Sequence, residues 1–214
     1  MDDQGMAQVQ IDAVLWARDI MMDPGVVYLD SETTGVSKWS EIIDLAIINQ
    51  DGNPLFDALI KPINPIPYEA TRIHGIDDYM VKHAMTFPEA WEQIGPILGD
   101  VSRVVIYNAD FDTRMIEQDV LRHGLEVVEY QHTCAMRWYA RLTYQWNPKK
   151  RDWKWIKLGD ALARMGIDHD HEAHRALADT YMTRDLIKAM SDVKLDQEDG
   201  GFRQLSLLPV SEVW

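Results

Sequence analysis

Cysteine is almost absent from this chain: Cys134 is the single thiol among 214 residues, so no internal disulfide can form. Such scarcity favours a reducing compartment. The sequence also lacks any apolar run near the roughly 20 residues that a transmembrane helix needs. Asp2 and Asp3 stand where a signal peptide would carry basic residues. We therefore expect a cytoplasmic protein with no membrane contact.

Basic residues are scarce as well. Lys and Arg number 21 against 35 Asp and Glu, which gives a formal net charge of −14. This balance argues against a surface that coats polyanions without selectivity. It does not exclude a nucleic-acid substrate, because metal-binding carboxylates count as negative although bound cations would offset them. The length suits one domain with extensions.

The apolar pattern predicts strands first and then alternating strands and helices, which is typical of an α/β fold with a mixed sheet flanked by helices. Strands are expected at 26–30, 42–49, 55–61 and 104–107. Helices are expected at 9–22, 87–98, 112–123, 133–144, 157–165 and 175–190. Residues 1–25 are interpreted as a helical extension, 26–193 as the main domain, and 194–214 as a flexible linker with a short tail.

Two carboxylates end the first predicted strand. Because residues i and i+2 of a strand point to the same face, Asp30 and Glu32 project side by side after the apolar run 26–29. Like charges this close are costly unless a hard divalent cation lies between them. Open α/β sheets also place their ligand crevices at such strand ends. The segment therefore predicts a metal site.

Further candidate ligands lie downstream. The strand at 104–107 leads into Asp110 and Asp112, which compete for the role of a third acid at the start of a helix. His174 precedes Asp179 by five residues. Within one helix this spacing would separate their side chains by about 140°. If both face the same metal ion, His174 must lie in the turn before the helix.

Four segments, in this order, resemble the motifs of the DEDDh 3′–5′ exonucleases, the family of RNase T and of the proofreading ε subunit of bacterial replicative DNA polymerase. They are Asp-x-Glu-Thr-Thr-Gly at 30–35, Ile-His-Gly-Ile at 73–76, Asn-Ala-x-Phe-Asp at 108–112 and His-x4-Asp at 174–179. Each motif is weak alone, but four in order across residues 26–190 are specific. The resemblance implies an RNase H-like exonuclease fold.

The resemblance also implies a ligand set for two Mg²⁺ or Mn²⁺ ions. It selects Asp112 over Asp110 as the third acid. Asp30 would bridge the two ions, Glu32 and Asp179 would bind the ion on the nucleophile side, and Asp112 would help to hold the other. Two cations about 3.5–4 Å apart can stabilise both the attacking and the leaving oxygen of a phosphodiester displacement.

The resemblance assigns the remaining roles in the site. His174 would take the proton from the attacking water, which suits imidazole chemistry. Arg175 occupies the place where the tyrosine subclass would carry its base, so the histidine subclass fits better. Residues implied at the 3′-terminal nucleotide and the scissile region are Thr33, Thr34, His74, Ile76 and Asn108.

A basic segment interrupts the acidic sequence. Its cations Lys149, Lys150, Arg151, Lys154 and Lys157 surround Trp153 and Trp155, with Asp152 as the opposing charge. One interpretation is a loop that contacts phosphates, chiefly through residues 149–151, with aromatic rings available for base stacking. The other is a solvated loop whose tryptophans pack on the core. The sequence leaves both open.

The tail resembles the short peptide by which bacterial replication and repair proteins bind the sliding clamp. The glutamine would orient an extended peptide while leucines enter apolar pockets. The alternative is a tail that packs its leucines on its own domain, because short motifs recur by chance. The residues concerned are Gln204, Leu205, Leu207 and Leu208.

The leading hypothesis is a metal-dependent 3′–5′ exonuclease that releases nucleoside 5′-monophosphates, mainly from single-stranded DNA ends, in replication or repair. The preference for DNA rests chiefly on the tail. A second hypothesis is a 3′–5′ exoribonuclease of the RNase T or oligoribonuclease type. A third is a non-catalytic module that binds the clamp or nucleic acid, against which the intact acids and histidine argue.

Overall fold

The computed structural model describes residues 3–168, 174–198 and 201–205. The chain forms two compact units, which we call the sheet unit and the helical unit. The sheet unit comprises Pro24–Cys134 and Asp170–Tyr181, and the helical unit comprises Met1–Asp23, Ala135–His169 and Met182–Trp214. Within the described residues, no helix is both long and apolar enough to cross a membrane.

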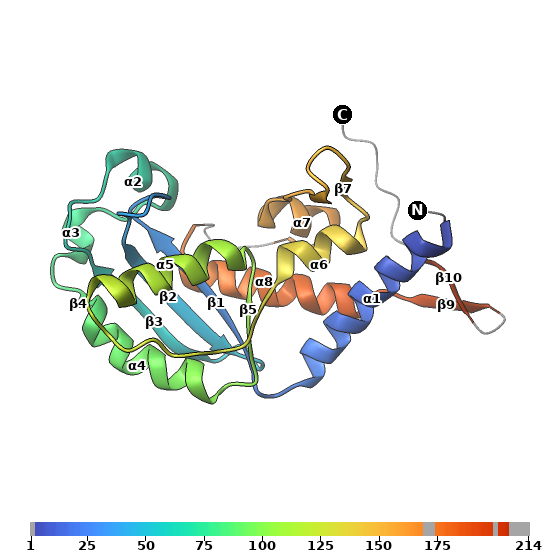
Figure 1. The fold of residues 1–214 in the computed structure, drawn as a ribbon, viewed down its shortest axis with the longest axis horizontal. Coiled ribbons are helices and arrows are strands. Elements are labelled where there is room, and N and C mark those ends of the chain that lie inside the picture. The colour runs from blue at the N-terminus through green and yellow to red at the C-terminus, as the bar shows by residue number, and fades with distance from the viewer. Residues whose placement is uncertain (1–2, 169–173, 199–200, 206–214) are drawn as a thin grey trace. The chain divides into compact units, whose positions relative to one another are not determined.

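A six-stranded mixed sheet organises the sheet unit (Figure 1). Its strands are β1 (Val26–Thr33), β2 (Ile42–Asn49), β3 (Pro54–Lys61), β4 (Met85–Thr86), β5 (Arg103–Ile106) and β6 (His132–Cys134), in the order β4-β3-β2-β1-β5-β6. β1 pairs antiparallel with β2 on one side and parallel with β5 on the other. The sheet with its flanking helices confirms the predicted α/β class.

The main core lies between this sheet and two helices, α4 (Phe87–Asp100) and α5 (Ala109–Arg122), which lie across one sheet face in Figure 1. α4 begins with a capping box, in which Thr86 and Glu89 satisfy each other's backbone amides. Buried aliphatic side chains from β1, β2 and β5 meet those of both helices. Burial of these residues fixes which side chains of β1 point away from the helices.

Two short helices, α2 (Tyr68–His74) and α3 (Asp78–Val81), cover a smaller apolar cluster. These helices were not predicted from the sequence, because elements of 7 and 4 residues carry too little periodicity to recognise. Gly75 ends α2 with φ of +75°, a backbone conformation that glycine adopts without steric cost. The segment that follows it places Ile76 in this cluster.

The helical unit contains the longest helix, α1 (Asp3–Met22), with α6 (Ala135–Leu142) and α7 (Leu158–Arg164). Trp16 of α1 stacks on Trp138 of α6, with ring centroids 5.0 Å apart. Among the described residues, the helical unit also contains two strand pairs. β7 (Trp146–Asn147) pairs with β8 (Asp152–Trp153), and β9 (Leu195–Glu198) pairs with β10 (Gly201–Leu205). α8 (Ala176–Ser191) begins in the sheet unit and ends in the helical unit.

Several predicted elements need correction. β1 extends to Thr33 rather than ending at residue 30. The segment predicted as a helix from residue 133 begins as strand β6, because pairing with β5 competes with local helix propensity. Residues 195–198, predicted as part of a flexible linker, form β9. Acidic residues followed by glycines occur in hairpin connections as well as in linkers, so the composition of this segment does not by itself exclude strands.

Candidate metal centre

β1 brings the first two acids to one face of the sheet. Asp30 lies opposite Ala46 of β2, and Glu32 lies opposite Asp44, so the alternation of the strand holds through both acids. The pairing with β2 becomes irregular only after Glu32. Because directly paired residues share a sheet face, the side chains of Asp30, Glu32 and Asp44 emerge on the same side.

α5 supplies the third acid from its first turn. Asp112 is 3% exposed, whereas Asp110 is an exposed residue of the same turn. Ser31, which stands between the two acids of β1, donates a hydrogen bond of 2.7 Å from its Oγ to Oδ1 of Asp112. This buried bond joins the start of α5 to β1. Of the two residues that competed in the sequence, the structure places Asp112 beside the β1 acids.

His174 and Asp179 complete the arrangement. His174 lies in the turn before α8, with φ of +70°, and Asp179 lies in the first turn of the helix. One ligand atom each from Glu32, His174 and Asp179 lie within 4.8 Å of one another. Side chains from two distant parts of the chain therefore meet at the end of β1.

The electrostatics of these acids are unfavourable for ionisation. Burial raises the pKa of the Asp30 carboxyl well above its usual range, and neighbouring negative charges raise it further. These neighbours are Asp112, Asp179, Glu32 and Asp44. Ionised carboxylates held this close repel one another unless cations lie between them.

Glu32 and Asp112 show the same effect. Burial and the charge of Asp179 raise the pKa of Glu32 to about 8, although the guanidinium of Arg175 opposes the rise. Burial raises the pKa of Asp112 to about 7, although the hydrogen bond from Ser31 opposes it. Such a set of oxygen ligands beside an imidazole suits a hard divalent cation, which would offset the repulsion.

α2 brings two further predicted residues to this region. His74 is 6% exposed, and its Nδ1 accepts a hydrogen bond of 3.0 Å from the backbone amide of Ile76. Burial lowers the pKa of His74, and the charge of His174 lowers it further, which places the two imidazoles within electrostatic reach. Ile76 itself is fully buried, so its side chain supports the wall rather than the open surface of the site.

The loop after β1 uses its hydroxyls internally. Thr33 Oγ1 donates to the carbonyl of Gly35 at 2.7 Å, and Thr34 Oγ1 accepts from the amide of Glu41 at 2.9 Å. Gly35 has φ of +153°, and a Cβ added there would lie 3.0 Å from Ser40 Oγ. Glycine is therefore required for the close turn that follows the first two acids. Asn108, the last predicted contact residue, lies at the N-cap of α5.

Two residues near the centre were missed as functional candidates. Asp44 is 1% exposed and accepts a hydrogen bond of 2.8 Å from Nε of Arg175. A carboxylate that interrupts the apolar run Ile42–Leu45 is an available sequence signal, because a buried charge needs a partner. The sequence alone did not identify that partner. From the sequence, Arg175 was noted only because it occupies the position where the tyrosine subclass would carry its base.

The basic segment forms the β7–β8 hairpin of the helical unit. Asn147 Oδ1 accepts hydrogen bonds from the amides of Lys149 and Lys150 at 3.1 and 3.3 Å, which shapes the tip, and residues 149–151 are exposed. Trp153 packs edge-on against Tyr144 and Trp146, which are themselves partly exposed, so these contacts lie within the hairpin region rather than on the core. Trp155 is 70% exposed, as the stacking interpretation expects.

The predicted clamp-binding residues are described only in part. The backbone of Gln204 and Leu205 belongs to β10. Leu207 and Leu208 lie outside the described residues.

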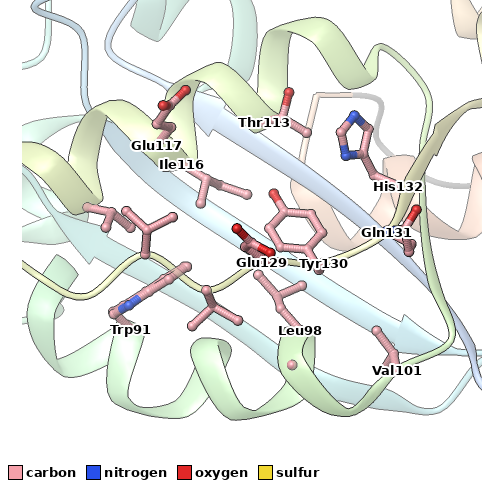
Figure 2. Close-up of a pocket in the computed structure, with 14 residues that line it drawn as sticks. Trp91, Leu98, Val101, Thr113, Ile116, Glu117, Glu129, Tyr130, Gln131 and His132 are labelled. Carbon is pink, nitrogen blue, oxygen red and sulfur yellow. The ribbon is translucent and has the colours of Figure 1, made fainter.

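A separate cavity of about 550 Å³ lies between α4, α5 and the segment that leads into β6 (Figure 2). Trp91 holds this segment through a hydrogen bond of 3.1 Å from its Nε1 to the carbonyl of Glu126. Burial, with the charges of Asp112 and Glu117, raises the pKa of Tyr130 in its wall to about 12. None of the predicted site residues lines the cavity.

Comparison with known proteins gives concordant results. The exonuclease family model RNase T matches residues 27–187. The protein named uncharacterized exonuclease CP81 of Escherichia phage 186 is 39% identical over 172 residues, which are 77% of this chain and 87% of that protein. DNA polymerase III subunit epsilon of Pasteurella multocida (strain Pm70) is 26% identical over 198 residues, 87% of this chain and 76% of the relative.

Solved structures show the same fold at lower identity. Exonuclease X in complex with 5′ overhanging duplex DNA has a TM-score of 0.57 and 24% identity, over 77% of this chain and 90% of that chain. The zinc-bound complex of E. coli exonuclease I with single-stranded DNA has a TM-score of 0.63 and 18% identity, over 77% and 39% of the two chains.

Proposed function

Because the chain belongs to the RNase T family of exonucleases, we propose that it removes nucleotides from the 3′ ends of nucleic acids as a metal-dependent enzyme of the histidine subclass. The observation that supports this proposal most directly is the meeting of Glu32, His174 and Asp179 within 4.8 Å. The products are nucleoside 5′-monophosphates.

Two Mg²⁺ or Mn²⁺ ions are the cofactors in this proposal. The carboxylates of Asp30, Glu32, Asp112 and Asp179 would hold them, with Asp30 shared between the two positions. When bound, the ions supply positive charge to the attacking and leaving oxygens of the in-line displacement. The support for this assignment is the raised pKa of Asp30 and Glu32, since carboxyls that resist ionisation are stabilised by cations between them.

His174 acts as the general base. Its side chain is exposed beside Glu32 and Asp179, where it can accept the proton of the attacking water and pass it to solvent. Imidazole is an efficient base near neutral pH, and a positioned base contributes about 10²- to 10⁴-fold to rate.

The substrate strand ends between the centre and α2. Thr33, Thr34 and Gly35 form the loop against which the terminal nucleotide is seated, and His74 with Ile76 form the opposite wall. The pKa of His74 is lowered by burial and also by the charge of His174, so the two side chains lie close enough to interact, which supports this placement. Asn108 contacts the scissile region from the N-cap of α5. The exposed basic residues 149–151 contact phosphates of the nucleic acid.

Single-stranded DNA ends are the preferred substrate in this proposal. Two of the solved structures that share the fold were determined in complex with DNA, one with single-stranded DNA and one with duplex DNA that has a 5′ overhang. A curated relative is the epsilon subunit of a DNA polymerase. An exoribonuclease is the second candidate, because the matching family model is that of RNase T.

The C-terminal segment gives a further proposal: Gln204, Leu205, Leu207 and Leu208 bind the bacterial sliding clamp. The support is the sequence pattern, in which a glutamine precedes spaced leucines. Deleting residues 202–214 should abolish the heat of clamp binding in calorimetry while exonuclease activity on short DNA persists. Equal heats from the full chain and the truncated chain would refute the proposal.

A ladder assay tests the catalytic proposal. Single-stranded DNA, duplex DNA and RNA, each labelled at the 5′ end, are incubated with the wild type or with Asp179→Ala, in Mg²⁺ or in EDTA. We expect progressive shortening from the 3′ end with the wild type in Mg²⁺ only, fastest on single-stranded DNA. Fastest cleavage of RNA would instead identify the exoribonuclease, and shortening by the variant or in EDTA would contradict the assigned metal site.

A further inference from the structure

Asp44 links β2 to the start of α8. Its Oδ2 accepts a hydrogen bond of 2.8 Å from Nε of Arg175 and another of 3.3 Å from the backbone amide of Ala176. The carboxylate is 1% exposed, whereas the side chain of Arg175 is 40% exposed. One oxygen of a buried acid therefore holds both the side chain of one residue and the amide of the next.

This contact caps α8 from outside the helix. Ala176 is the first residue of α8, so its amide is one of the donors that the helix cannot satisfy by itself. A carboxylate at this end is favoured by hydrogen bonding and by the helix dipole. Capping residues usually lie next to the helix in sequence, but Asp44 lies on a strand 132 residues away.

The capped turn is the one that carries His174. This residue has φ of +70°, a backbone conformation that is uncommon for residues other than glycine, although histidine tolerates it better than most. Such a backbone persists only where surrounding contacts enforce it. The two hydrogen bonds to Asp44 begin at the next residue, so they restrain the peptide directly after the imidazole.

We propose that Asp44 and Arg175 form an internal clamp, unrelated to the sliding clamp, that positions the imidazole of His174 beside Glu32 and Asp179. The role of the clamp in catalysis rests on the proposed function, in which His174 is the base. Asp44 and Arg175 are positioning residues, since they act through the turn that they hold. Arg175 suits this place because its planar guanidinium donates in a fixed direction, which a lysine ammonium cannot reproduce.

A rival role for Asp44 must be separated from the clamp. Its Oδ1 is buried without a hydrogen-bond partner among the described residues. In the pairing of β1 with β2, Asp44 lies directly opposite Glu32. The same carboxylate could therefore contact a metal ion directly. The two roles differ in one respect: a clamp affects the rate only while His174 is present, whereas a metal ligand affects it in any background.

A double-mutant cycle uses this difference. Asp44→Asn is measured in the wild type and in His174→Asn, with kcat and KM determined on single-stranded DNA in Mg²⁺. We expect Asp44→Asn to lower kcat at least about tenfold in the wild type, with KM changed less than about threefold. In the His174→Asn background, the same change should lower kcat less than about threefold.

Amide hydrogen exchange provides a readout that does not depend on catalysis. In metal-free protein, Asp44→Ala removes both acceptor oxygens and should make the Ala176 amide exchange at least about tenfold faster while core strand amides stay protected. Arg175→Gln keeps the acceptor for Ala176 and should give a smaller effect, which covers the case in which Asp44→Ala does not fold. Lys188→Gln is the matched control, because Lys188 lies in the last turn of α8 and the change breaks only its exposed ion pair with Asp192, which follows the helix.

The outcomes are distinct. An equal loss of kcat in both backgrounds would overturn the clamp and assign Asp44 to metal binding. An active Asp44→Asn with wild-type kcat, or unchanged exchange at Ala176, would also overturn it. A wild type inactive on every nucleic acid would refute the proposed function instead, while the exchange experiment would still decide whether the clamp exists.

Discussion

His174 combines an uncommon backbone conformation with a side chain that can accept a proton. Its φ of +70° lies in the left-handed region, where the Cβ of an L-residue comes too close to the carbonyl oxygen that follows it. Asparagine tolerates this region and hydrogen-bonds, but it cannot accept a proton near neutral pH. Substitution by asparagine therefore removes the base and preserves the turn.

His174→Asn should lower kcat by about 10²- to 10⁴-fold, because a positioned general base contributes this much. KM and the melting temperature should remain close to those of the wild type, since no buried contact is lost. Steady-state kinetics on single-stranded DNA, with thermal unfolding followed by circular dichroism, would measure both. A loss of kcat smaller than about tenfold would contradict the role of His174 as the base.

Individual residues differed in how well the sequence revealed them. Asp30 and Glu32 follow from the two-residue period of a strand, which needs no tertiary information. The choice between Asp110 and Asp112 could not be made from the residues, because both lie in one helical turn; it needed the family resemblance, and the structure places only Asp112 against β1. Asp44 was missed because its partner lies 131 residues away.

Connecting segments around the centre are held by buried acids. Glu41 is 3% exposed, and its carboxylate accepts hydrogen bonds from the amides of Ile63 and Asn64 at 2.7 and 3.0 Å and from Nδ2 of Asn64 at 2.9 Å. This segment leads from β3 to α2. Glu41 thus fixes the approach to the helix that carries His74.

Glu41→Gln should destabilise the protein by roughly 1–3 kcal/mol, because charge-assisted bonds are replaced by weaker ones and one amide group is left poorly matched. KM should rise, since α2 is proposed to seat the terminal nucleotide. Urea unfolding and steady-state kinetics would measure the two effects. Glu69→Gln is the control, because Glu69 is exposed on α2 itself. Equal stability of the two variants would contradict the role of Glu41.

The β7–β8 hairpin presents its cations at the tip. Reversing the charges of Lys149, Lys150 and Arg151 to glutamate should raise KM, and kcat should change little because the metal ligands lie elsewhere. The dependence of KM on salt should weaken, since each lost phosphate contact removes about 0.7 from the logarithmic slope for a single strand. Kinetics at several salt concentrations would test this. An unchanged KM and salt slope would show that the tip is only a solvated loop.

Elements were predictable in proportion to their length and periodicity. β2, α4 and α8 were expected within about two residues of their observed bounds, because each has a sustained apolar pattern. β6 and the β9–β10 hairpin were not, because their pairing is settled by partner strands rather than by local sequence. The motif residues in the loops were found only through the family resemblance.

At the scale of the whole molecule, the raised pKa values make folding depend on pH. A carboxyl whose pKa is raised on folding holds its proton more tightly in the folded state than in the unfolded state. For Glu32 the pKa rises from 4.5 to about 8. Across this interval the folded protein binds more protons, so the contribution of Glu32 to stability falls as pH rises. Without metal ions, this penalty is complete above the folded pKa.

Glu32→Gln should therefore be more stable than the wild type at pH 8 in EDTA, with a melting temperature higher by a few degrees, about the shift that 1 kcal/mol produces. The two proteins should melt at nearly the same temperature at pH 5. Added Mg²⁺ should raise the melting temperature of the wild type more than that of the variant. A difference that does not change with pH would show that the carboxyl of Glu32 is not perturbed by folding.

The crowded acids at the end of β1 also determine what leaves the protein when a metal ion enters. The pKa of Glu32, raised to about 8, lets this carboxyl hold a proton near neutral pH, and a cation that binds there must displace it, so metal loading should acidify the surrounding solution. The heat measured for loading then includes the ionisation heat of the buffer. Heats of loading measured in two buffers that do not bind the metal should differ by the number of protons released times the difference in buffer ionisation heat, so the proton count of the centre can be measured.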